Sequence, residues 1–594
     1  MEKKINDFSF RVATVNGTGS QSANNILFKS LFRMGVGVCG KNLFPSNIQG
    51  LPTWFQIRVS EKGYQCLREH DDIAVLMNPE TAKDDVAWMQ PGKSLFYNSN
   101  LITIAPDQLK PGQNIYGIPI EELSKTINPE LRHLLKNLFY VAALSHLYGI
   151  DKDVIGSVIA DTFKSKQKAI DANLVAFNIG LDYAKANFEK KDGFMVEKRE
   201  GANKGKIVIE GNSAAALGSI YGGCTFLAWY PITPSSSLAE SVDSFAGKLR
   251  ADGTGKSKFA SIQAEDELSS IGMVIGASWA GARAMTSTSG PGISLMGEFI
   301  GLAYYAEVPA VIWDVQRVGP STGLPTRTQQ CDIQKAALAS HGDTKHVLLF
   351  PSSPKECFEM AGTAFDLAER LQTPVFVMTD LDLGMNIWMD DEFQHQDKPF
   401  DRGKVLSAEN LTRIEAFGRY QDVDNDGICY RTLPGTDSPK GSFFTRGSGH
   451  DEFARYTESP VVYTKNVDRL LRKWHTAKKY VPAPIITGDP KAKVGIIACG
   501  TSNPAVTETM DRMNNKGVKY LRLRAYPFTK EVEEFIGSCD QVFIVEQNRD
   551  GQLQQLLEID IRGCQPKLKG VRYYGGFPLS ADFIEREINE KAGK

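Results

Sequence analysis

The segment Tyr230-Pro-Ile-Thr-Pro-Ser-Ser-Ser237 is a turn that joins two elements of regular structure. It follows a run of small residues, Gly211-Asn-Ser-Ala-Ala-Ala-Leu-Gly218, and precedes a stretch with helical spacing. Two prolines bracket Thr233, and a helix interior does not accommodate that pattern. The hydroxyl of Thr233 is therefore held near the N-terminus of the next helix, where free backbone N–H groups favour an anion. Taken alone, the segment is a capped turn.

Strand and helix patterns alternate on both sides of this turn, from about residue 207 to residue 390. Strands are predicted at 225–229, 259–263, 284–287, 310–315, 346–350 and 375–379, and helices at 268–283, 293–306 and 354–371. This alternation is typical of a doubly wound parallel sheet, which binds ligands at the carboxyl ends of its strands. The predicted fold class is therefore α/β.

Two further α/β segments flank this region, so the chain is predicted to be multidomain. The N-terminal one has strands at 8–15 and 54–59 and helices at 131–148 and 169–188, and the C-terminal one has strands at 494–498, 518–523, 541–545 and 571–574 and a last helix at 583–591. The charged, glycine-rich stretch between the first two regions indicates a linker. The predicted domains are residues 1–188, a linker at 189–206, a central domain at 207–480 with an irregular extension at 391–480, and residues 481–594.

Two local motifs suggest ligands that the surrounding residues do not support. In the first, Gly17 and Gly19 follow a strand, but the third glycine of a dinucleotide fingerprint is missing, which favours a tight turn. In the second, Asp422-Val-Asp-Asn-Asp-Gly427 resembles the start of a calcium loop, but the twelfth position is Leu433 instead of glutamate. A polar turn is therefore the better interpretation.

The bulk composition excludes several classes of function. Of the 594 residues, 68 are Lys or Arg and 70 are Asp or Glu, and a net charge of −2 gives no electrostatic basis for binding nucleic acid. The chain has neither a signal-peptide core nor an apolar run of membrane-spanning length, so we expect a cytoplasmic protein that does not enter a membrane. The nine cysteines contain no C-x-x-C pair, which argues against a zinc ribbon or a cysteine-ligated iron–sulfur cluster.

Four loops that follow successive predicted strands carry polar groups suited to binding. The first holds Thr233. The second, Ser261-Ile-Gln-Ala-Glu-Asp-Glu267, places Glu265 at a strand end, although such acids also simply favour a helix N-terminus. The third, Met285-Thr-Ser-Thr-Ser-Gly-Pro-Gly292, suits close approach of a ligand. The fourth starts at Arg317, whose planar guanidinium grips a carboxylate, and continues to Thr322 and Thr326.

In these motifs the chain resembles the alpha subunit of 2-oxoacid:ferredoxin oxidoreductases, in the form with a gamma-type domain fused ahead of the alpha part. The layout is most similar to that of the 2-oxoglutarate enzymes. The matching motifs are Gly211-Asn212, Tyr230-Pro-Ile-Thr-Pro-Ser-Ser236, Gln263-Ala-Glu265, Thr286-Ser-Thr-Ser-Gly-Pro-Gly292, Val315-Gln-Arg317, Gly319-Pro-Ser-Thr-Gly-Leu-Pro-Thr326, Tyr430-Arg-Thr-Leu-Pro-Gly435 and Val545-Glu-Gln-Asn548. The resemblance implies a gamma-type α/β domain, a doubly wound domain of the pyrimidine-binding type found in thiamine enzymes, and a C-terminal domain like that of transketolase.

The resemblance also implies roles for individual residues. Glu265 corresponds to the glutamate that binds the pyrimidine ring of thiamine diphosphate, and Thr233 and Arg317 correspond to the groups that hold the 2-oxoacid carboxylate. The far end of a larger substrate is expected at Thr322 or Thr326. The remaining expected cofactor-binding residues are Tyr230, Pro231, Thr288 and Ser289. The loop at Ser20-Gln-Ser22 departs from the glycine-rich sequence of the family, so no coenzyme A or nucleotide role is assigned to it.

The implied reaction is oxidative decarboxylation of 2-oxoglutarate with coenzyme A as co-substrate, giving succinyl-CoA, CO₂ and reduced ferredoxin. The chain contains no Gly-Asp-Gly segment of the kind that holds Mg²⁺ for thiamine diphosphate. We therefore expect a beta subunit to share the thiamine diphosphate and to supply Mg²⁺ and a 4Fe–4S cluster. The resemblance further implies a dimer of alpha–beta dimers that reduces ferredoxin.

Three alternatives remain at this stage. The same chemistry could act on pyruvate, a branched-chain oxoacid or an aryl oxoacid. The chain could instead be a non-catalytic partner that only closes the active site of a beta subunit. A free-standing nicotinamide dehydrogenase is the third alternative, and the incomplete fingerprint at Gly17-Thr-Gly19 weighs against it.

Overall fold

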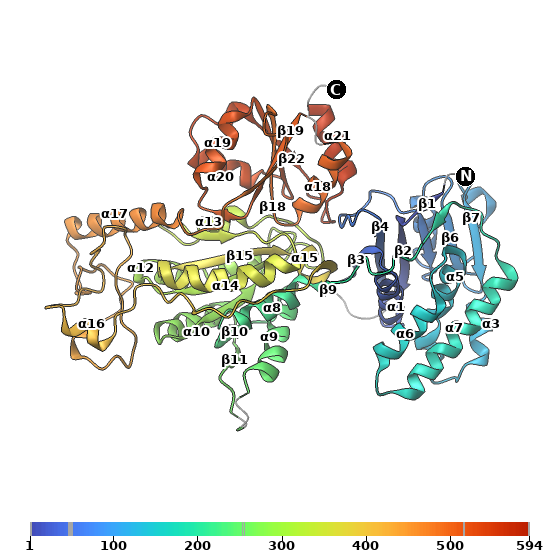
Figure 1. Cartoon of the computed structure of the whole chain (residues 1–594), viewed down its shortest axis with the longest axis horizontal. Helices are drawn as coiled ribbons and strands as arrows, with labels where there is room; N and C mark the ends of the chain where they lie inside the picture. Colours follow the sequence, from blue (N-terminus) through green and yellow to red (C-terminus); the bar gives the residue numbers. More distant parts are fainter. Residues whose placement is uncertain (1–2, 46–50, 252–253, 255, 515–516, 592–594) are drawn as a thin grey trace. The chain divides into compact units, whose positions relative to one another are not determined.

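The computed structural model describes residues 3–45, 51–251, 254, 256–514 and 517–591. They form two compact units, whose elements are labelled in Figure 1. Unit 1 comprises the described residues up to Val208, with Asn386–Glu392 and Ser580–Phe583. Unit 2 comprises Ile209–Met385, Phe393–Leu579 and the remaining described residues from Ile584.

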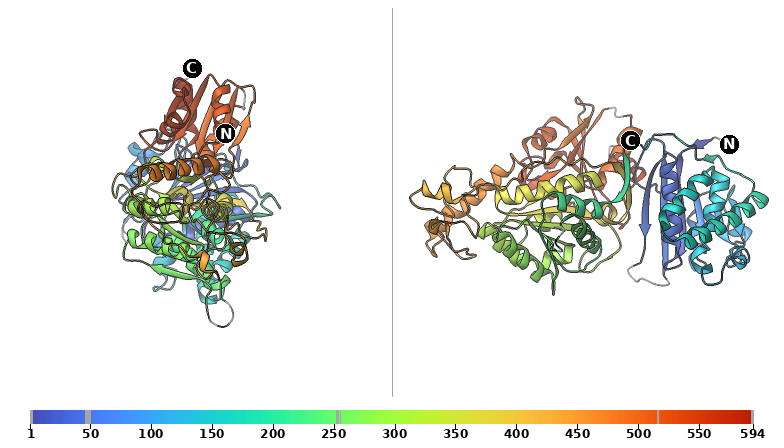
Figure 2. Two further views of the ribbon diagram at one scale, coloured as in Figure 1. Left: turned by 90° about the vertical axis from the view of Figure 1, so that its left-hand side faces the viewer. Right: turned by 60° about the horizontal axis from the view of Figure 1, so that its bottom comes forward.

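Unit 1 is built on an eight-stranded sheet in the order β7-β6-β5-β2-β4-β3-β16-β9. These strands are β7 (Asn114–Ile118), β6 (Ser94–Asn98), β5 (Ile73–Leu76), β2 (Asp7–Val15), β4 (Pro52–Ser60), β3 (Gly37–Leu43), β16 (Ile387–Asp391) and β9 (Lys206–Glu210). The first four are parallel, whereas β4 is antiparallel to both β2 and β3. The main helices are α1 (Ser20–Arg33), α5 (Leu138–Tyr148), α6 (Lys152–Phe163) and α7 (Gln167–Asn187). In the right-hand view of Figure 2 the cyan helices lie against the blue strands, and apolar side chains fill the interior between them.

Two details of unit 1 differ from, or add to, the sequence analysis. The single helix predicted at 131–148 is wrong: α4 (Arg132–Leu135) ends before α5 begins. Between them, Asn137 Nδ2 donates to the Thr18 carbonyl at 2.7 Å, a tertiary contact that accompanies the break. The stretch 189–206 contains β8 (Phe194–Met195), which pairs with β1 (Lys4–Ile5) of the same unit. The domain boundaries at 188 and 206 remain a prediction.

Unit 2 contains a seven-stranded sheet in the order β11-β10-β12-β13-β15-β14-β20. The strands are β10 (Phe226–Trp229), β11 (Ala260–Gln263), β12 (Ala284–Thr288), β13 (Ala310–Gln316), β14 (Val347–Leu349), β15 (Pro374–Asp380) and β20 (Ala525–Tyr526). All neighbouring strands except β14 and β20 are parallel, which confirms the doubly wound α/β prediction. The helices that pack on it include α9 (Ser236–Leu249), α10 (Glu267–Trp279) and α14 (Pro354–Leu371), and α8 (Gly211–Tyr221) packs against α9 and α14. The helix predicted at 293–306 is two helices, α11 (Gly290–Leu295) and α12 (Gly297–Ala306).

A second sheet of unit 2 forms the core of the C-terminal domain, in the order β17-β19-β18-β21-β22. Its strands are β17 (Ile485–Gly488), β18 (Val494–Cys499), β19 (Val518–Leu523), β21 (Gln541–Glu546) and β22 (Leu568–Arg572). The sheet is accompanied by the helices α18 (Ser502–Arg512), α19 (Lys530–Ser538), α20 (Gln552–Asp560) and α21 (Ala581–Lys591). The strand predicted at 571–574 is misplaced, because β22 already pairs with β21 from Leu568 and ends at Arg572.

The irregular extension contains α16 (Ala408–Thr412) and α17 (Pro460–Ala477). The acidic turn at 422–427 is paired with a lysine of the same extension. Lys404 Nζ lies 2.7 Å from a carboxylate oxygen of Asp424 and 2.8 Å from one of Asp426. An ammonium group therefore takes the position that a cation would need in this loop.

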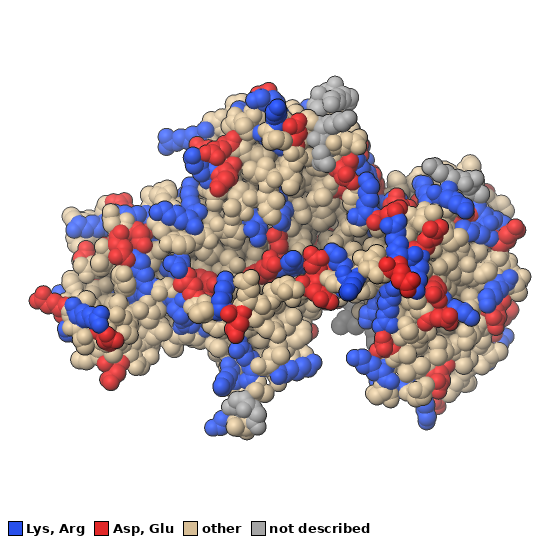
Figure 3. All heavy atoms as spheres, in the orientation of Figure 1, with Lys and Arg blue, Asp and Glu red and all other residues tan. Residues whose placement is uncertain are grey.

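The surface shows no large region of one charge on the face seen in Figure 3, where acidic and basic side chains are interspersed. Within the described residues, no helix combines the length and the apolar character needed to cross a bilayer.

A buried ion cluster joins the extension to the doubly wound sheet. The Glu307 carboxylate, after α12, accepts from Arg469 Nη2 at 2.5 Å and from Lys473 Nζ at 2.9 Å, both on α17. Burial favours neutral Glu307, but the two cations outweigh this effect and hold the pKa of Glu307 well below its ordinary value. The stabilisation from Glu307 is therefore complete above the pKa of an unfolded glutamate, about 4.3, and is lost as the pH falls towards the lower folded pKa.

Removing one cation from this cluster should be strongly destabilising. We expect Arg469→Met to lower the free energy of unfolding by about 3–5 kcal/mol, because it breaks a buried ion pair. The matched control is Arg472→Met on the same helix. Arg472 pairs with Asp422 in a more exposed position, so its loss should cost about 1 kcal/mol or less. Denaturant unfolding of both variants measures the difference, and equal costs would contradict the assignment.

Candidate functional site

The four predicted binding loops lie at the carboxyl ends of four neighbouring parallel strands. Thr233 follows β10, Glu265 follows β11, Thr288 ends β12 and Arg317 follows β13. The strands are in register, with Trp229 opposite Gln263 and Thr288 opposite Asp314. The predicted edge of the sheet is therefore present, and it brings together Thr233 and Arg317, which are 84 residues apart in the sequence.

Thr233 and Arg317 are in direct contact. Arg317 Nη1 donates to the Thr233 carbonyl at 2.7 Å, and the Arg317 side chain is largely buried, the residue being 7% exposed. Burial lowers the pKa of the Arg317 guanidinium below its ordinary value, against the opposing effect of the Asp332 and Glu267 carboxylates. The guanidinium is thus a partly desolvated cation, and such a group binds an anion more strongly than a cation in water does.

The turn that carries Thr233 is fixed from the opposite side by α8. Asn212 Nδ2 donates to the Pro234 carbonyl at 2.9 Å and to Ser237 Oγ at 2.8 Å. The Thr233–Pro234 peptide bond is cis. Asn212, which the sequence analysis recorded as a motif without a role, therefore positions the turn.

Glu265 lies at an exposed edge of the sheet. Every residue of β11 is exposed, and so are Glu265, Tyr230 and Pro231. The next residue, Asp266, caps α10 by accepting from the Ser269 backbone N–H at 2.6 Å. The capping role therefore belongs to Asp266, and the carboxylate of Glu265 is open to a ligand or a partner.

The third loop is tightly packed. Thr288 and Ser289 are fully buried. A Cβ atom at Gly292 would lie 1.9 Å from Thr288 Oγ1, so a side chain there would displace the threonine. Within the described residues, the hydroxyls of Ser287 and Ser289 have no hydrogen-bond partner. This loop offers buried polar groups next to the Thr233–Arg317 contact.

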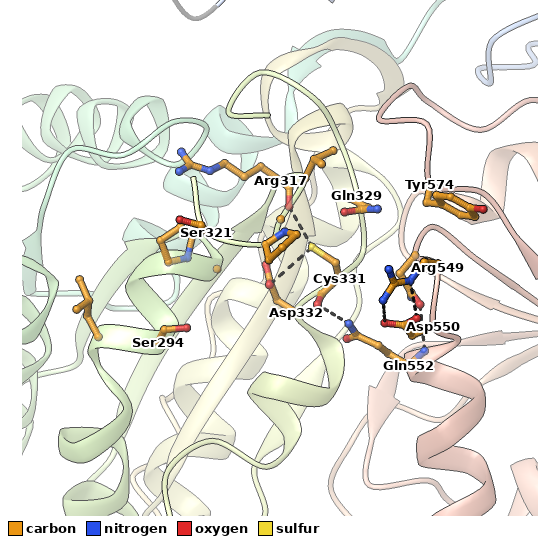
Figure 4. Close-up of a pocket in the computed structure, with 17 residues that line it drawn as sticks. Ser294, Arg317, Ser321, Gln329, Cys331, Asp332, Arg549, Asp550, Gln552 and Tyr574 are labelled. Carbon is orange, nitrogen blue, oxygen red and sulfur yellow. Dashed lines mark hydrogen bonds and ion pairs between the residues drawn. The ribbon is translucent and has the colours of Figure 1, made fainter. Parts of the chain in front are cut away.

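A pocket of about 910 Å³ lies between the doubly wound sheet and the C-terminal domain (Figure 4). Arg317, Cys331 and Asp332 line it from the former, and Asn548 and Tyr574 are among the residues that line it from the latter. Thr233, Glu265, Thr322 and Thr326 do not line this pocket. Thr322 is exposed, whereas Thr326 is buried and its hydroxyl accepts from Arg327 Nη1 at 3.3 Å.

Two interacting carboxyl groups near Arg317, those of the buried Asp314 and the half-buried Asp332, were missed by the sequence analysis. Burial, reinforced by the neighbouring Asp332, holds the pKa of Asp314 well above its ordinary value. Burial also raises the pKa of Asp332 to about 7, although the Cys331 thiol and the Arg317 guanidinium act in the opposite direction. Burial therefore favours the neutral form of both carboxyl groups. The sequence feature that could have revealed this pair is Asp314, an acidic residue within the otherwise mainly apolar strand Ala310–Gln316.

Comparisons with known proteins agree with this geometry. The family model described as "Pyruvate flavodoxin/ferredoxin oxidoreductase, thiamine diP-bdg" matches residues 217–396, and the one described as "Pyruvate ferredoxin/flavodoxin oxidoreductase" matches residues 9–183. The chain is 30% identical to 2-oxoacid:ferredoxin oxidoreductase 2, subunit alpha, of Aeropyrum pernix, over 93% of this chain and 92% of that protein. The chain belongs to the family of 2-oxoacid:ferredoxin oxidoreductase alpha subunits.

Two further proteins that are similar to this alpha subunit have names that mention 2-oxoglutarate. One is the 2-oxoglutarate synthase subunit KorA of Methanocaldococcus jannaschii, which is 36% identical over 54% of this chain and 84% of its own. The other is the structure of 2-oxoglutarate:ferredoxin oxidoreductase from Magnetococcus marinus with 2-oxoglutarate, coenzyme A and succinyl-CoA bound. It is 30% identical, with a TM-score of 0.90, and the match covers 99% of this chain and 100% of that one. The four strand-end loops thus belong to the thiamine diphosphate-binding region of an oxidoreductase alpha subunit.

Proposed function

We propose that this alpha subunit takes part in the oxidative decarboxylation of 2-oxoglutarate with coenzyme A, giving succinyl-CoA, CO₂ and reduced ferredoxin. The observation that carries the proposal is the contact of Arg317 with Thr233 at the carboxyl ends of the sheet. The choice of 2-oxoglutarate is supported by the similarity to the Methanocaldococcus 2-oxoglutarate synthase subunit and to the Magnetococcus enzyme.

In this proposal Arg317 and the Thr233 hydroxyl hold the carboxylate of the 2-oxoacid. A guanidinium makes short, charge-assisted hydrogen bonds to a carboxylate, and the partly buried position of Arg317 strengthens them. Thr322 and Thr326 are proposed to bind the far end of the substrate. Because Thr326 is buried beside Arg327, the exposed Thr322 is the more accessible of the two.

The residues around Glu265 fit the pyrimidine side of thiamine diphosphate. The exposed carboxylate of Glu265 can accept a hydrogen bond from a ring N–H. The Ala264 N–H donates to the Trp229 carbonyl at 2.8 Å, so the ends of the two strands lie together and Tyr230 and Pro231 follow the strand next to that of Glu265. Thr288 and Ser289 are proposed to border the cofactor. When bound, thiamine diphosphate supplies the carbanion chemistry, and the chain supplies orientation and a fixed electrostatic environment.

We propose that a beta subunit covers this edge of the sheet and completes the site. The exposed strand β11 and the exposed Glu265 support the proposal, since a thiamine site must exclude water. The beta subunit would share the thiamine diphosphate and supply Mg²⁺ and a 4Fe–4S cluster for the reduction of ferredoxin. The proposed assembly is a dimer of alpha–beta dimers in the cytoplasm.

The direct test is to co-purify the chain with the product of the gene that accompanies it. Bound thiamine diphosphate, metal and iron are measured, and the dye-linked turnover of 2-oxoglutarate is compared with that of pyruvate, a branched-chain oxoacid and an arylpyruvate. We expect the highest kcat/KM with 2-oxoglutarate. A preference for another oxoacid would overturn the substrate, and turnover of none of them would overturn the function.

A further inference from the structure

The segment that follows Arg317 is attached to the C-terminal domain. Gln330 lies at the centre of the attachment: its backbone N–H donates to the Gln547 carbonyl at 2.9 Å, and its carbonyl accepts from Asn548 Nδ2 at 2.9 Å. Gln330 Nε2 also donates to the Cys499 carbonyl at 3.1 Å. Gln330, Gln547 and Asn548 are all nearly fully buried, so these hydrogen bonds have no competition from water.

A second attachment leads directly to the substrate-binding arginine. Gln552, the first residue of α20, donates from Nε2 to the Cys331 carbonyl at 2.6 Å and accepts from the Gln334 N–H at 3.1 Å. The Cys331 thiol in turn donates to the Arg317 carbonyl at 3.1 Å. Figure 4 shows this path from α20 through Cys331 to Arg317 along one side of the pocket.

A third attachment is made by Thr328, which precedes Gln330 and Cys331 in the chain. The Thr328 N–H donates to the Gly576 carbonyl at 3.0 Å, and Thr328 Oγ1 accepts from the Asp382 N–H at 3.3 Å. Residues 318–332 form a long connection without a helix or strand, and such connections are mobile unless their backbone groups are bound. Here the C-terminal domain binds several of those groups.

We propose that the C-terminal domain is a positioning element for substrate binding, and that Gln552, acting through Cys331, holds Arg317 in the place where it receives the oxoacid carboxylate. The proposal rests on the function proposed above. The C-terminal domain contributes none of the predicted catalytic residues, and the proposal makes Gln552 a positioning residue that acts on Arg317 through Cys331.

The test uses two variants of the same helix in the complete complex with its partner. Gln552→Met keeps the length of the side chain but removes both hydrogen bonds. The matched control is Gln554→Met, because Gln554 is also half-buried but bonds only Glu558 and Arg572 of the C-terminal domain among its described side-chain contacts. We expect Gln552→Met to raise the KM for the oxoacid about tenfold, with a smaller change in kcat, and Gln554→Met to leave the KM within about twofold.

Hydrogen–deuterium exchange of residues 318–332 provides a readout that does not depend on activity. Gln552→Met should accelerate exchange there, and Gln554→Met should not. The proposal is overturned if the exchange is unchanged in Gln552→Met, or if both variants change the KM equally. If the wild-type complex turns over no oxoacid, the proposed function fails, but the exchange rates still decide whether α20 holds the segment.

Discussion

Replacing Arg317 by methionine is expected to lower kcat/KM for the oxoacid by about 100- to 1,000-fold, chiefly through a higher KM. The change removes a charge-assisted hydrogen-bonding partner from a partly desolvated site, and losses of this kind cost roughly 3–4 kcal/mol. Methionine fills a similar volume, so the effect should come from the lost guanidinium. Steady-state kinetics of the complete complex with 2-oxoglutarate and a viologen dye measure it.

Arg283 provides a matched control for this variant. It is also buried and immediately precedes a strand of the same sheet, but it lies at the amino end of β12, where it donates to Asp366 at 2.6 Å. Arg283→Met should therefore lower stability and leave the KM for the oxoacid unchanged. If the two variants raise the KM alike, the kinetic effect reports general damage to the sheet, and Arg317 does not bind the substrate.

Arg317→Lys separates the charge from the geometry of the side chain. Lysine keeps a positive charge but lacks the planar fork that donates to the Thr233 carbonyl and that, in our proposal, also donates to the substrate carboxylate. We expect an intermediate kcat/KM, between those of the wild type and Arg317→Met. A wild-type value would show that charge alone suffices at this position.

The predicted binding edge of the sheet could be located from the sequence because each of its parts had a local signal. Prolines on both sides of Thr233 marked a turn, and Arg317 stood just beyond an apolar strand. Because the strands and helices alternate, the sheet is parallel and the loops after its strands lie together at the carboxyl ends of those strands. The observed register, with β11, β10, β12 and β13 adjacent, confirms the sheet on which that inference depended.

The contacts between domains had no comparable signal. Gln330 and Gln552 are ordinary polar residues in the sequence, and their hydrogen bonds described above join positions between 169 and 221 residues apart. Glutamine forms such bonds wherever packing brings a carbonyl near, so neither periodicity nor spacing reveals the partner. The break between α4 and α5 likewise coincides with a tertiary hydrogen bond, from Asn137 to Thr18, which the sequence does not reveal. Tertiary hydrogen bonds of this kind require the folded structure.

The Glu265→Gln variant is expected to lower kcat by about 100- to 1,000-fold, the range typical of a positioned acid–base group. Glutamine keeps the shape of the side chain but replaces one acceptor oxygen with an N–H donor, which would face the ring N–H that we propose Glu265 accepts from. The loss should appear in kcat more than in the KM for the oxoacid, because Arg317 and Thr233 are unchanged. Dye-linked turnover of the complete complex at saturating thiamine diphosphate measures it.

Glu240 on α9 serves as the control, because it is an exposed glutamate on a helix of the same unit that the site does not use. Glu240→Gln should retain wild-type turnover, and both variants should unfold at the same temperature as the parent, since exposed charges contribute little to stability. If the Glu265→Gln enzyme keeps most of its turnover, Glu265 is not part of the active site. The exposed end of β11 would then be assigned to contact with the proposed beta subunit and not to catalysis.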